Sequence, residues 1–149
     1  MEKILEEKVA LVTGASRGIG KAISIKFAEE GAKVALVYSS TADDKYPNAI
    51  NTTLKEIISK DGTAIAYDFD LQSIGKLQEI IDRVVAEYGR LDILVNNAAF
   101  SPFVSLDEIT QAVWEKVFAV NLEAPFFLSR YVAEIMKSNS GLINVTSMA

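Results

Sequence analysis

The fold of this chain is decided by the stretch KVALVTGASRGIGKA, residues 8–22. A short, almost entirely apolar run predicts a buried strand, and three glycines follow it at the start of a segment of helical period. In such a strand–turn–helix unit, Gly14 would allow the tight turn, Gly18 would let the backbone approach a diphosphate, and Gly20 would let the helix pack closely on the strand. The helix N-terminus would point its unpaired amides at the anion. The alternative is a glycine turn that serves packing alone.

Strands of this kind alternate with helical segments along the chain. The strands are expected at residues 8–14, 33–40, 63–70, 91–98 and 141–147, the last one also buried. Apolar residues at spacings of three and four predict the helices: around Ile19, Ile23 and Phe27, from Ile74 to Tyr88 behind an N-capping Ser73, from Val113 to Ile135, and more weakly over 48–60 through Leu54, Ile57 and Ile58.

This alternation predicts a doubly wound α/β domain, in which helices cover both faces of a parallel, Rossmann-like sheet of five strands. Residues 1–149 would form one dinucleotide-binding domain. In sheets of this type the ligand lies at the carboxyl ends of the strands.

Composition excludes several classes of function. Half of the 149 residues are hydrophobic, and the formal net charge of −5 is unsuited to binding nucleic acid or an anionic membrane. The sequence has no cysteine and no histidine, which excludes disulfides, a Ser-His-Asp triad, and thiolate or imidazole metal sites, so we expect no metal centre. An acidic start and the lack of a long apolar run predict a soluble, cytoplasmic protein.

The charge near the glycine turn indicates which dinucleotide would bind. Arg17 lies in the first turn of the expected helix, where a cation opposes the helix dipole by about 0.3–1 kcal/mol unless an anion lies beside it. The second strand ends in Tyr-Ser-Ser, residues 38–40, where an NAD site would carry a carboxylate for the ribose 2′-hydroxyl. Arginine with serine hydroxyls suits a 2′-phosphate, so we expect NADP rather than NAD. The alternative is a solvated arginine, with Asp43 or Asp44 folding back to receive NAD.

Four motifs, in this order, resemble the short-chain dehydrogenase/reductase family: TGASRGIG at 13–20, NNAA at 96–99, VNL at 120–122 and NVTS at 144–147. The resemblance covers the whole chain, but only the N-terminal part of a typical member. It implies an oxidoreductase that transfers hydride between NADP and a small carbonyl or alcohol substrate, and that is a homo-oligomer at full length. Many relatives with TGASRGIG are 3-oxoacyl-carrier-protein reductases and others act on sugars or steroids, so the substrate stays open.

The resemblance also implies which residues bind the coenzyme. Ser39 and Ser40 would share the 2′-phosphate with Arg17. Asp70, with Leu71, would hold the adenine, and Asp68 is the competing carboxylate. The diphosphate and the 2′-phosphate would be cradled by Gly14, Ser16, Arg17, Gly18, Ile19 and Gly20.

On the nicotinamide side, Asn97, Ala98 and Ala99 would line the site, although the family usually has glycine in place of Ala99. Asn96 would instead brace neighbouring strands.

Two residues match the active site of the family. Asn121 matches its asparagine, and Ser147 matches the serine that donates a hydrogen bond to the substrate oxygen. Taken alone, Ser147 would be a strand-end serine that caps a turn. Pro125 cannot donate the helical hydrogen bond that would reach the carbonyl of Asn121, so we expect this carbonyl to be kept available for a water in a proton relay. The alternative is a proline tolerated in a surface helix.

The Tyr-x-x-x-Lys pair of the family has no match among the five tyrosines, and would lie beyond Ser147. We therefore expect these residues to be the cofactor-binding part of a longer enzyme, without the family's C-terminal strands and helices, and inactive alone. One alternative is a non-catalytic nucleotide-binding module or pseudoenzyme. Another is a methyltransferase-like domain, but it would not explain NNAA or NVTS.

Overall fold

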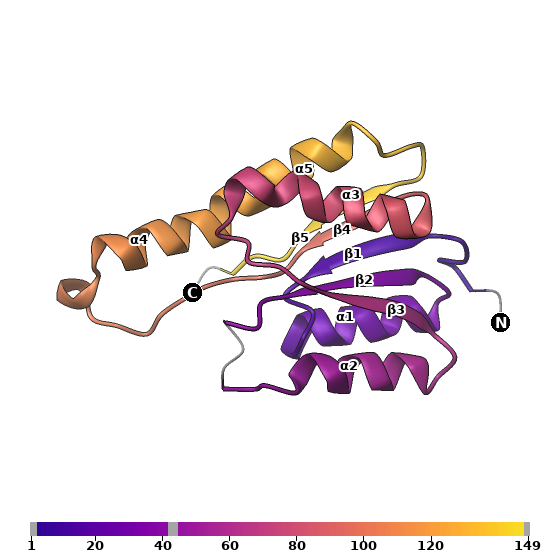
Figure 1. Ribbon diagram of the computed structural model, residues 1–149, viewed down its shortest axis with the longest axis horizontal. Coiled ribbons are helices and arrows are strands. Elements are labelled where there is room, and N and C mark those ends of the chain that lie inside the picture. The colour runs from indigo at the N-terminus through magenta and orange to yellow at the C-terminus, as the bar shows by residue number, and fades with distance from the viewer. Residues whose placement is uncertain (1–2, 42–44, 148–149) are drawn as a thin grey trace.

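The computed structural model describes residues 3–41 and 45–147. Within them, one sheet of five parallel strands has the order β3-β2-β1-β4-β5 (Figure 1). Because β4 lies on the opposite side of β1 from β2, the strand order reverses between β1 and β4, and a doubly wound sheet binds its ligand at such a point. The strands are β1 Val9–Thr13, β2 Lys33–Tyr38, β3 Thr63–Asp68, β4 Ile93–Asn96 and β5 Gly141–Asn144.

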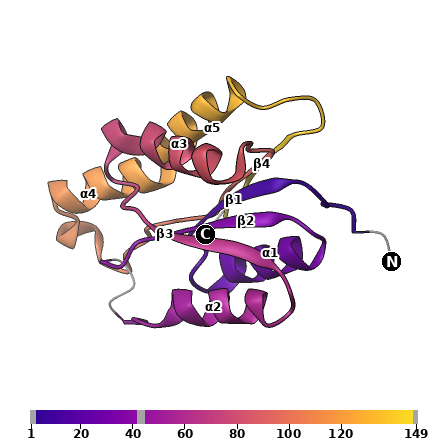
Figure 2. The same cartoon turned by 45° about the vertical axis from the view of Figure 1, so that its right-hand side comes forward.

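Helices cover both faces of the sheet, as Figures 1 and 2 show from two directions. Two helices, α1 (Gly18–Glu29) and α2 (Ala49–Ile58), lie on one face, and α3 (Leu77–Tyr88) and α5 (Ala124–Ala133) lie on the other. The helix α4 (Gln111–Phe118) extends past the carboxyl ends of the strands, and the π-helical turn Ala119–Glu123 joins it to α5. Short 3-10 turns occur at Ile74–Lys76 and Leu106–Glu108.

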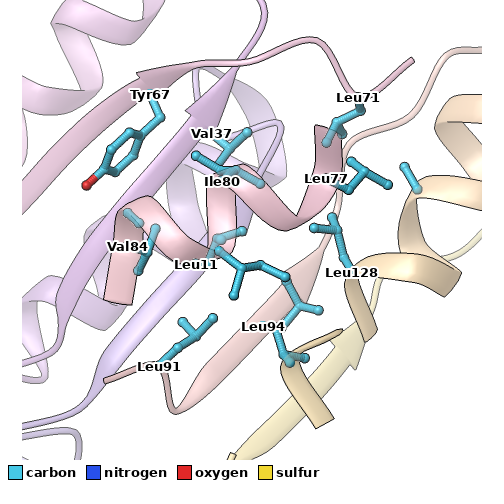
Figure 3. Packing of buried hydrophobic residues seen from close by; sticks show 14 of the residues in the cluster. Leu11, Val37, Tyr67, Leu71, Leu77, Ile80, Val84, Leu91, Leu94 and Leu128 are labelled. Atoms are coloured by element: carbon cyan, nitrogen blue, oxygen red, sulfur yellow. The ribbon is translucent and has the colours of Figure 1, made fainter. Parts of the chain in front are cut away.

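The hydrophobic core has two parts, one on each face of the sheet. On the α3 and α5 side, Leu11, Leu94 and Leu128 are at most 1% exposed and pack with Ile80 and Val84 (Figure 3). On the other side, buried residues of β1, β2 and β4 pack against α1 and α2. A sheet that is buried on both faces needs apolar residues at successive strand positions, and this explains the continuous apolar runs in the sequence.

The predicted architecture is confirmed, with strands shorter than expected at their ends. The predicted buried face of α1 was wrong in part: Ile23 and Phe27 are partly buried and pack against the core, but Ile19 does not. Ile19 is 62% exposed, whereas Gly20, Ser24 and Ala28 face inward. The helix lies so close to the sheet that small residues occupy the contact, and Ile23 is only partly buried beside them.

Two details of the other helices also differ from expectation. In α2, Ile50, Thr53 and Ile57 are buried, whereas Ile58 is 56% exposed. Ser73 precedes the 3-10 turn rather than α3, and its side chain makes no capping hydrogen bond.

The long helix expected from Val113 to Ile135 is not uniformly α-helical. Its hydrogen bonding widens into the π-helical turn Ala119–Glu123, immediately before Pro125 enters the first turn of α5. A proline without an N–H disturbs the regular ladder, and a wider turn accommodates the change. Ile135 lies beyond the end of α5 and is 40% exposed.

The fifth strand was predicted to be buried, and this was wrong. β5 forms an edge of the sheet and pairs only with β4 among the described strands. Leu142 and Ile143 are 42% and 43% exposed. The apolar pattern of a strand shows that it can be buried, but neighbouring elements decide whether it is.

Candidate functional site

A cavity of about 450 Å³ opens at the carboxyl ends of β1, β2, β3 and β4. Its size lies in the range of small-molecule and cofactor sites. It occupies the region where the strand order reverses, as the sequence predicted. Its walls come from the turn after β1, the ends of β2 and β3, the segment after β4, and α4 with the π-helical turn: Gly14, Ser16, Arg17, Gly18, Ile19, Val37, Tyr38, Ser39, Phe69, Asp70, Leu71, Gln72, Asn97, Ala98, Ala99, Phe100, Lys116 and Val120.

The glycine turn has the geometry that the sequence predicted. Gly14 has φ +65° and Gly18 has φ +57°, a region that residues with a Cβ rarely adopt. An added Cβ on Gly18 would meet no atom within 4 Å, so the backbone is open there. At Gly20 an added Cβ would lie 2.1 Å from the carbonyl oxygen of Gly14, so only glycine permits the observed packing. The side chain of Arg17, the N-cap residue, makes no capping hydrogen bond in α1, and the first amides of the helix lie at its cavity end.

The hydroxyl of Thr13 fastens the glycine turn to the segment after β4. It accepts the backbone N–H groups of Asn97 and Ala98, each at 3.0 Å, and donates to the Val95 carbonyl at 3.3 Å. The Asn97 amide donates to the carbonyls of Thr13 and Gly14 at 3.0 and 3.2 Å. Asn97 lines the cavity. The sequence did not indicate that Thr13 and the Asn97 amide hold two walls of the cavity together.

Arg17 and Ser39 both line the cavity, on adjoining walls. The guanidinium of Arg17 also lies over the ring of Tyr46, with Cζ 5.0 Å from the ring centroid. Ser40 is exposed and is not part of the described cavity wall; its backbone N–H donates to Asp68 at 2.9 Å. Asp43 and Asp44, the alternative partners for NAD, lie outside the described residues.

The two acidic candidates for the adenine end lie in different places. Asp70 and Leu71 line the cavity, and Asp70 accepts the backbone N–H of Gln72 at 2.9 Å. Asp68 lies at the end of β3, and its carboxylate accepts the backbone N–H of Ser40. The structure thus brings Asp70, rather than Asp68, to the cavity.

Asn121 acts on the cavity through its neighbour Phe100. Its side chain accepts the backbone N–H of Phe100 at 2.8 Å and donates to the carbonyl of Phe100 at 2.9 Å. The ammonium of Lys116 lies 4.3 Å from the centroid of the Phe100 ring. These contacts fix the segment after β4 to α4 and the π-helical turn. Lys116 carried no sequence signal of its own for this site, and Val120 was noted only as part of the VNL motif.

Asn96 braces neighbouring strands, as predicted. Its amide donates to the side chains of Asn144 at 2.9 Å and Ser129 at 3.1 Å. Ser147 follows β5, is exposed and is not part of the described cavity wall.

The charge of the cavity differs from that of the protein. Among its walls stand two cationic residues, Arg17 and Lys116, and one acid, Asp70, whereas the whole sequence carries a net charge of −5. This local excess of positive charge suits an anionic ligand.

Two further features are absent from residues 3–41 and 45–147. No helix in these ranges is long and apolar enough to cross a membrane. The same ranges hold no group of three or more histidine, cysteine, aspartate or glutamate side chains that could bind a metal ion.

Residues 8–149 match the model of the short chain dehydrogenase family. An uncharacterized oxidoreductase of Thermotoga maritima is 39% identical over 95% of this chain and 54% of its own length. The NADPH-dependent aldehyde reductase 1, chloroplastic, of Arabidopsis thaliana is 39% identical over 97% of this chain and 51% of its own.

A solved short chain dehydrogenase of Burkholderia cenocepacia, in complex with NADP, superimposes with a TM-score of 0.87 at 33% identity, over 97% of this chain and 57% of that one. The chain spans about half the length of the curated relatives that it matches. The motifs, the fold and these relatives agree: the chain belongs to the short-chain dehydrogenase family.

Proposed function

We propose that this chain is the coenzyme-binding part of an NADP-dependent oxidoreductase that transfers hydride between nicotinamide and a carbonyl or alcohol substrate. The observation that carries the proposal is the cavity where the open N-terminus of α1, Arg17 and Ser39 meet. The Arabidopsis relative is named as NADPH-dependent and the Burkholderia structure is a complex with NADP, which supports the same coenzyme here. When bound, the coenzyme supplies or accepts the hydride.

The phosphate groups would be held by the glycine turn. Backbone amides at Gly18, Ile19 and Gly20 would face the diphosphate, since they begin α1 and have no helical partner. Arg17 and Ser39 would bind the 2′-phosphate, because a guanidinium makes charge-assisted hydrogen bonds to phosphate oxygens. Ser16, which lines the described cavity, would join this cradle. Ser40, which does not line it, would supply a second hydroxyl near the 2′-phosphate.

The remaining walls would orient the two ring systems. Asp70 and Leu71 would hold the adenine, and Asn97, Ala98 and Ala99 would line the ribose and nicotinamide side. Ala99 lines the same cavity and is exposed. The fixed hydrogen bonds of Thr13 and Asn97 keep this wall in place relative to the phosphate cradle.

At the substrate end, Ser147 would donate a hydrogen bond to the substrate oxygen and Asn121 would hold the adjacent wall. The π-helical turn at Ala119–Glu123 includes Asn121 and ends before Pro125. Because proline has no N–H to donate, the regular bond to the Asn121 carbonyl is absent, and we propose that this carbonyl is available to bind a water. The substrate would be a small carbonyl or alcohol compound, of which a 3-oxoacyl thioester is one candidate.

The proposal includes self-association. Exposed apolar residues follow one another along α4, the π-helical turn and α5: Trp114, Phe118, Leu122 and Phe126 are 57%, 37%, 59% and 61% exposed. An apolar stripe at this spacing suits a helix-to-helix contact between copies of the chain.

Coenzyme titration with the purified chain tests the central part of the proposal. We expect NADPH to bind more tightly than NADH, measured by the fluorescence of the reduced nicotinamide. Replacing Arg17→Ala should weaken NADPH binding by about 10- to 100-fold, the range for a hydrogen bond to a charged group, and leave NADH binding nearly unchanged. Arg130→Ala removes the same charge from the exposed surface of α5 and should change neither affinity. Equal affinity for the two coenzymes would contradict the assigned role of Arg17.

A further inference from the structure

The helix α2 is fastened to the phosphate side of the cavity. The hydroxyl of Thr53, which is fully buried, donates to the carbonyl of Ser16 in the glycine turn at 2.8 Å. On the surface, Lys21 of α1 forms an ion pair with Glu56 of α2 at 2.8 Å. These contacts fix α2 relative to the turn that carries Arg17.

Tyr46 lies directly before this helix. Its carbonyl accepts the N–H of Ala49 at 3.0 Å, in the turn that begins α2, so its backbone is tied to the helix. Tyr46 is 54% exposed, and the centroid of its ring lies 5.0 Å from Cζ of the Arg17 guanidinium. A cation over an aromatic face is attracted by the ring quadrupole, and arginine can also stack flat on the ring.

We propose that Tyr46 is a positioning residue for coenzyme selectivity: its ring holds the Arg17 guanidinium at the cavity wall, ready for the ribose 2′-phosphate. The inference rests on the proposed binding of NADP. An arginine side chain has many rotamers, and binding a phosphate must restrict them. A ring that already restricts them lowers the cost of binding, so Tyr46 would act through Arg17 without touching the coenzyme.

The predicted effect is selective. Without the ring, the chain should bind NADPH about two- to fivefold more weakly, the fold-change that corresponds to an exposed cation–π contact. The affinity for NADH should not change, because NADH has no 2′-phosphate for Arg17 to bind.

The experiment compares four variants in the wild-type background, each titrated with NADPH and with NADH. Tyr46→Ala removes the ring, Tyr46→Leu keeps an apolar side chain without an aromatic face, and Tyr46→Phe keeps the face. We expect Ala and Leu to lower NADPH affinity and Phe to retain most of it. The fourth variant, Arg17→Ala, provides a second background, in which Tyr46→Leu should have no further effect.

Several results would overturn the inference. These are an unchanged NADPH affinity for Tyr46→Leu, an equal loss for both coenzymes, and a full effect of Tyr46→Leu in the Arg17→Ala background. Circular dichroism will show whether each variant folds, and Tyr46→Leu and Tyr46→Phe supply the answer if Tyr46→Ala does not. Failure of the wild-type chain to bind either coenzyme would instead reject the proposed function, and the inference with it.

Discussion

Gly20→Ala should disrupt both the stability of the domain and its cavity. An added Cβ would lie 2.1 Å from the Gly14 carbonyl oxygen and 2.5 Å from the Asn97 amide nitrogen. The helix would have to withdraw by about 1 Å to reach a tolerable contact, because the obstructing oxygen belongs to the backbone and cannot swing away. That movement would stretch the 3.2 Å hydrogen bond from Asn97 to Gly14.

The net free energy can be worked from these contacts. Overpacking typically costs about 1–3 kcal/mol and the weakened hydrogen bond about 1 kcal/mol more, whereas alanine gains about 1 kcal/mol over glycine within a helix. With little room to relax against backbone, we expect the free energy of unfolding to fall by about 2–3 kcal/mol. NADPH binding should be lost, since the displaced helix carries the amides that we propose hold the diphosphate.

Urea denaturation followed by circular dichroism measures the change in the free energy of unfolding. Gly75→Ala is the matched control: an added Cβ there meets no atom within 4 Å, and the residue has no positive φ, so its effect should stay within about 0.5 kcal/mol. If Gly20→Ala were as stable as this control, the close approach of α1 to the strand would not be what requires glycine.

Three further predictions concern contacts outside the phosphate cradle. Asn97→Asp replaces two donated hydrogen bonds by a carboxylate that faces two carbonyl oxygens. The free energy of unfolding, measured by thermal denaturation, should fall by about 1–3 kcal/mol. An unchanged midpoint would contradict the assignment of these hydrogen bonds. Burial raises the pKa of Asp92, but hydrogen bonds from Arg90 and the Val9 N–H and the nearby cations outweigh it, and the net pKa lies below its usual 3.8. Ionised Asp92 therefore stabilises the folded protein at pH values above its usual pKa, and this stabilisation is lost as the pH falls through the lowered pKa. The loss of unfolding free energy in Asp92→Asn, measured by urea denaturation, should accordingly shrink below about pH 4. A loss that does not depend on pH would refute this. Ile143→Lys puts a charge on the exposed edge strand β5 and should reduce the association of copies of the chain, measured by light scattering. Unchanged association would show that copies do not associate through this edge.

The strands and the glycine turn could be predicted because their signals are local. β1 reads as a buried strand from its own residues, and Gly14 marks a positive φ that few other residues adopt. The family resemblance assigned Asp70 and Asn97 to the coenzyme site, and both line the cavity.

The inward faces of helices were harder to predict. In α1 the helix lies so close to the sheet that the small residues Gly20, Ser24 and Ala28 form its buried face. The spacing of large apolar residues predicted Ile19 there instead, and Ile19 is exposed. The exposure of Leu142 depends on what lies beside and above β5, and no residue within the strand encodes that.

The contacts that shape the site were missed because they join distant parts of the chain. Asn121 binds the backbone of Phe100, and Arg17 lies over Tyr46, yet neither partner has a pattern that identifies the other. The π-helical turn before Pro125 likewise arises from the whole helix, although the proline indicated that regular bonding would be disturbed there.

The central claim is that a 2′-phosphorylated nicotinamide coenzyme binds across the carboxyl ends of the strands, with its diphosphate at the start of α1. Amide chemical shifts of the isotopically labelled chain, followed as NADP is added, test it most directly. We expect saturable shifts that are largest at Gly14–Gly20, Ser39, Leu71 and Ala98. Saturable shifts centred elsewhere, such as the shallow hollow around Asn51, Leu54 and Ile58 of α2, would contradict it, and so would no shifts at all.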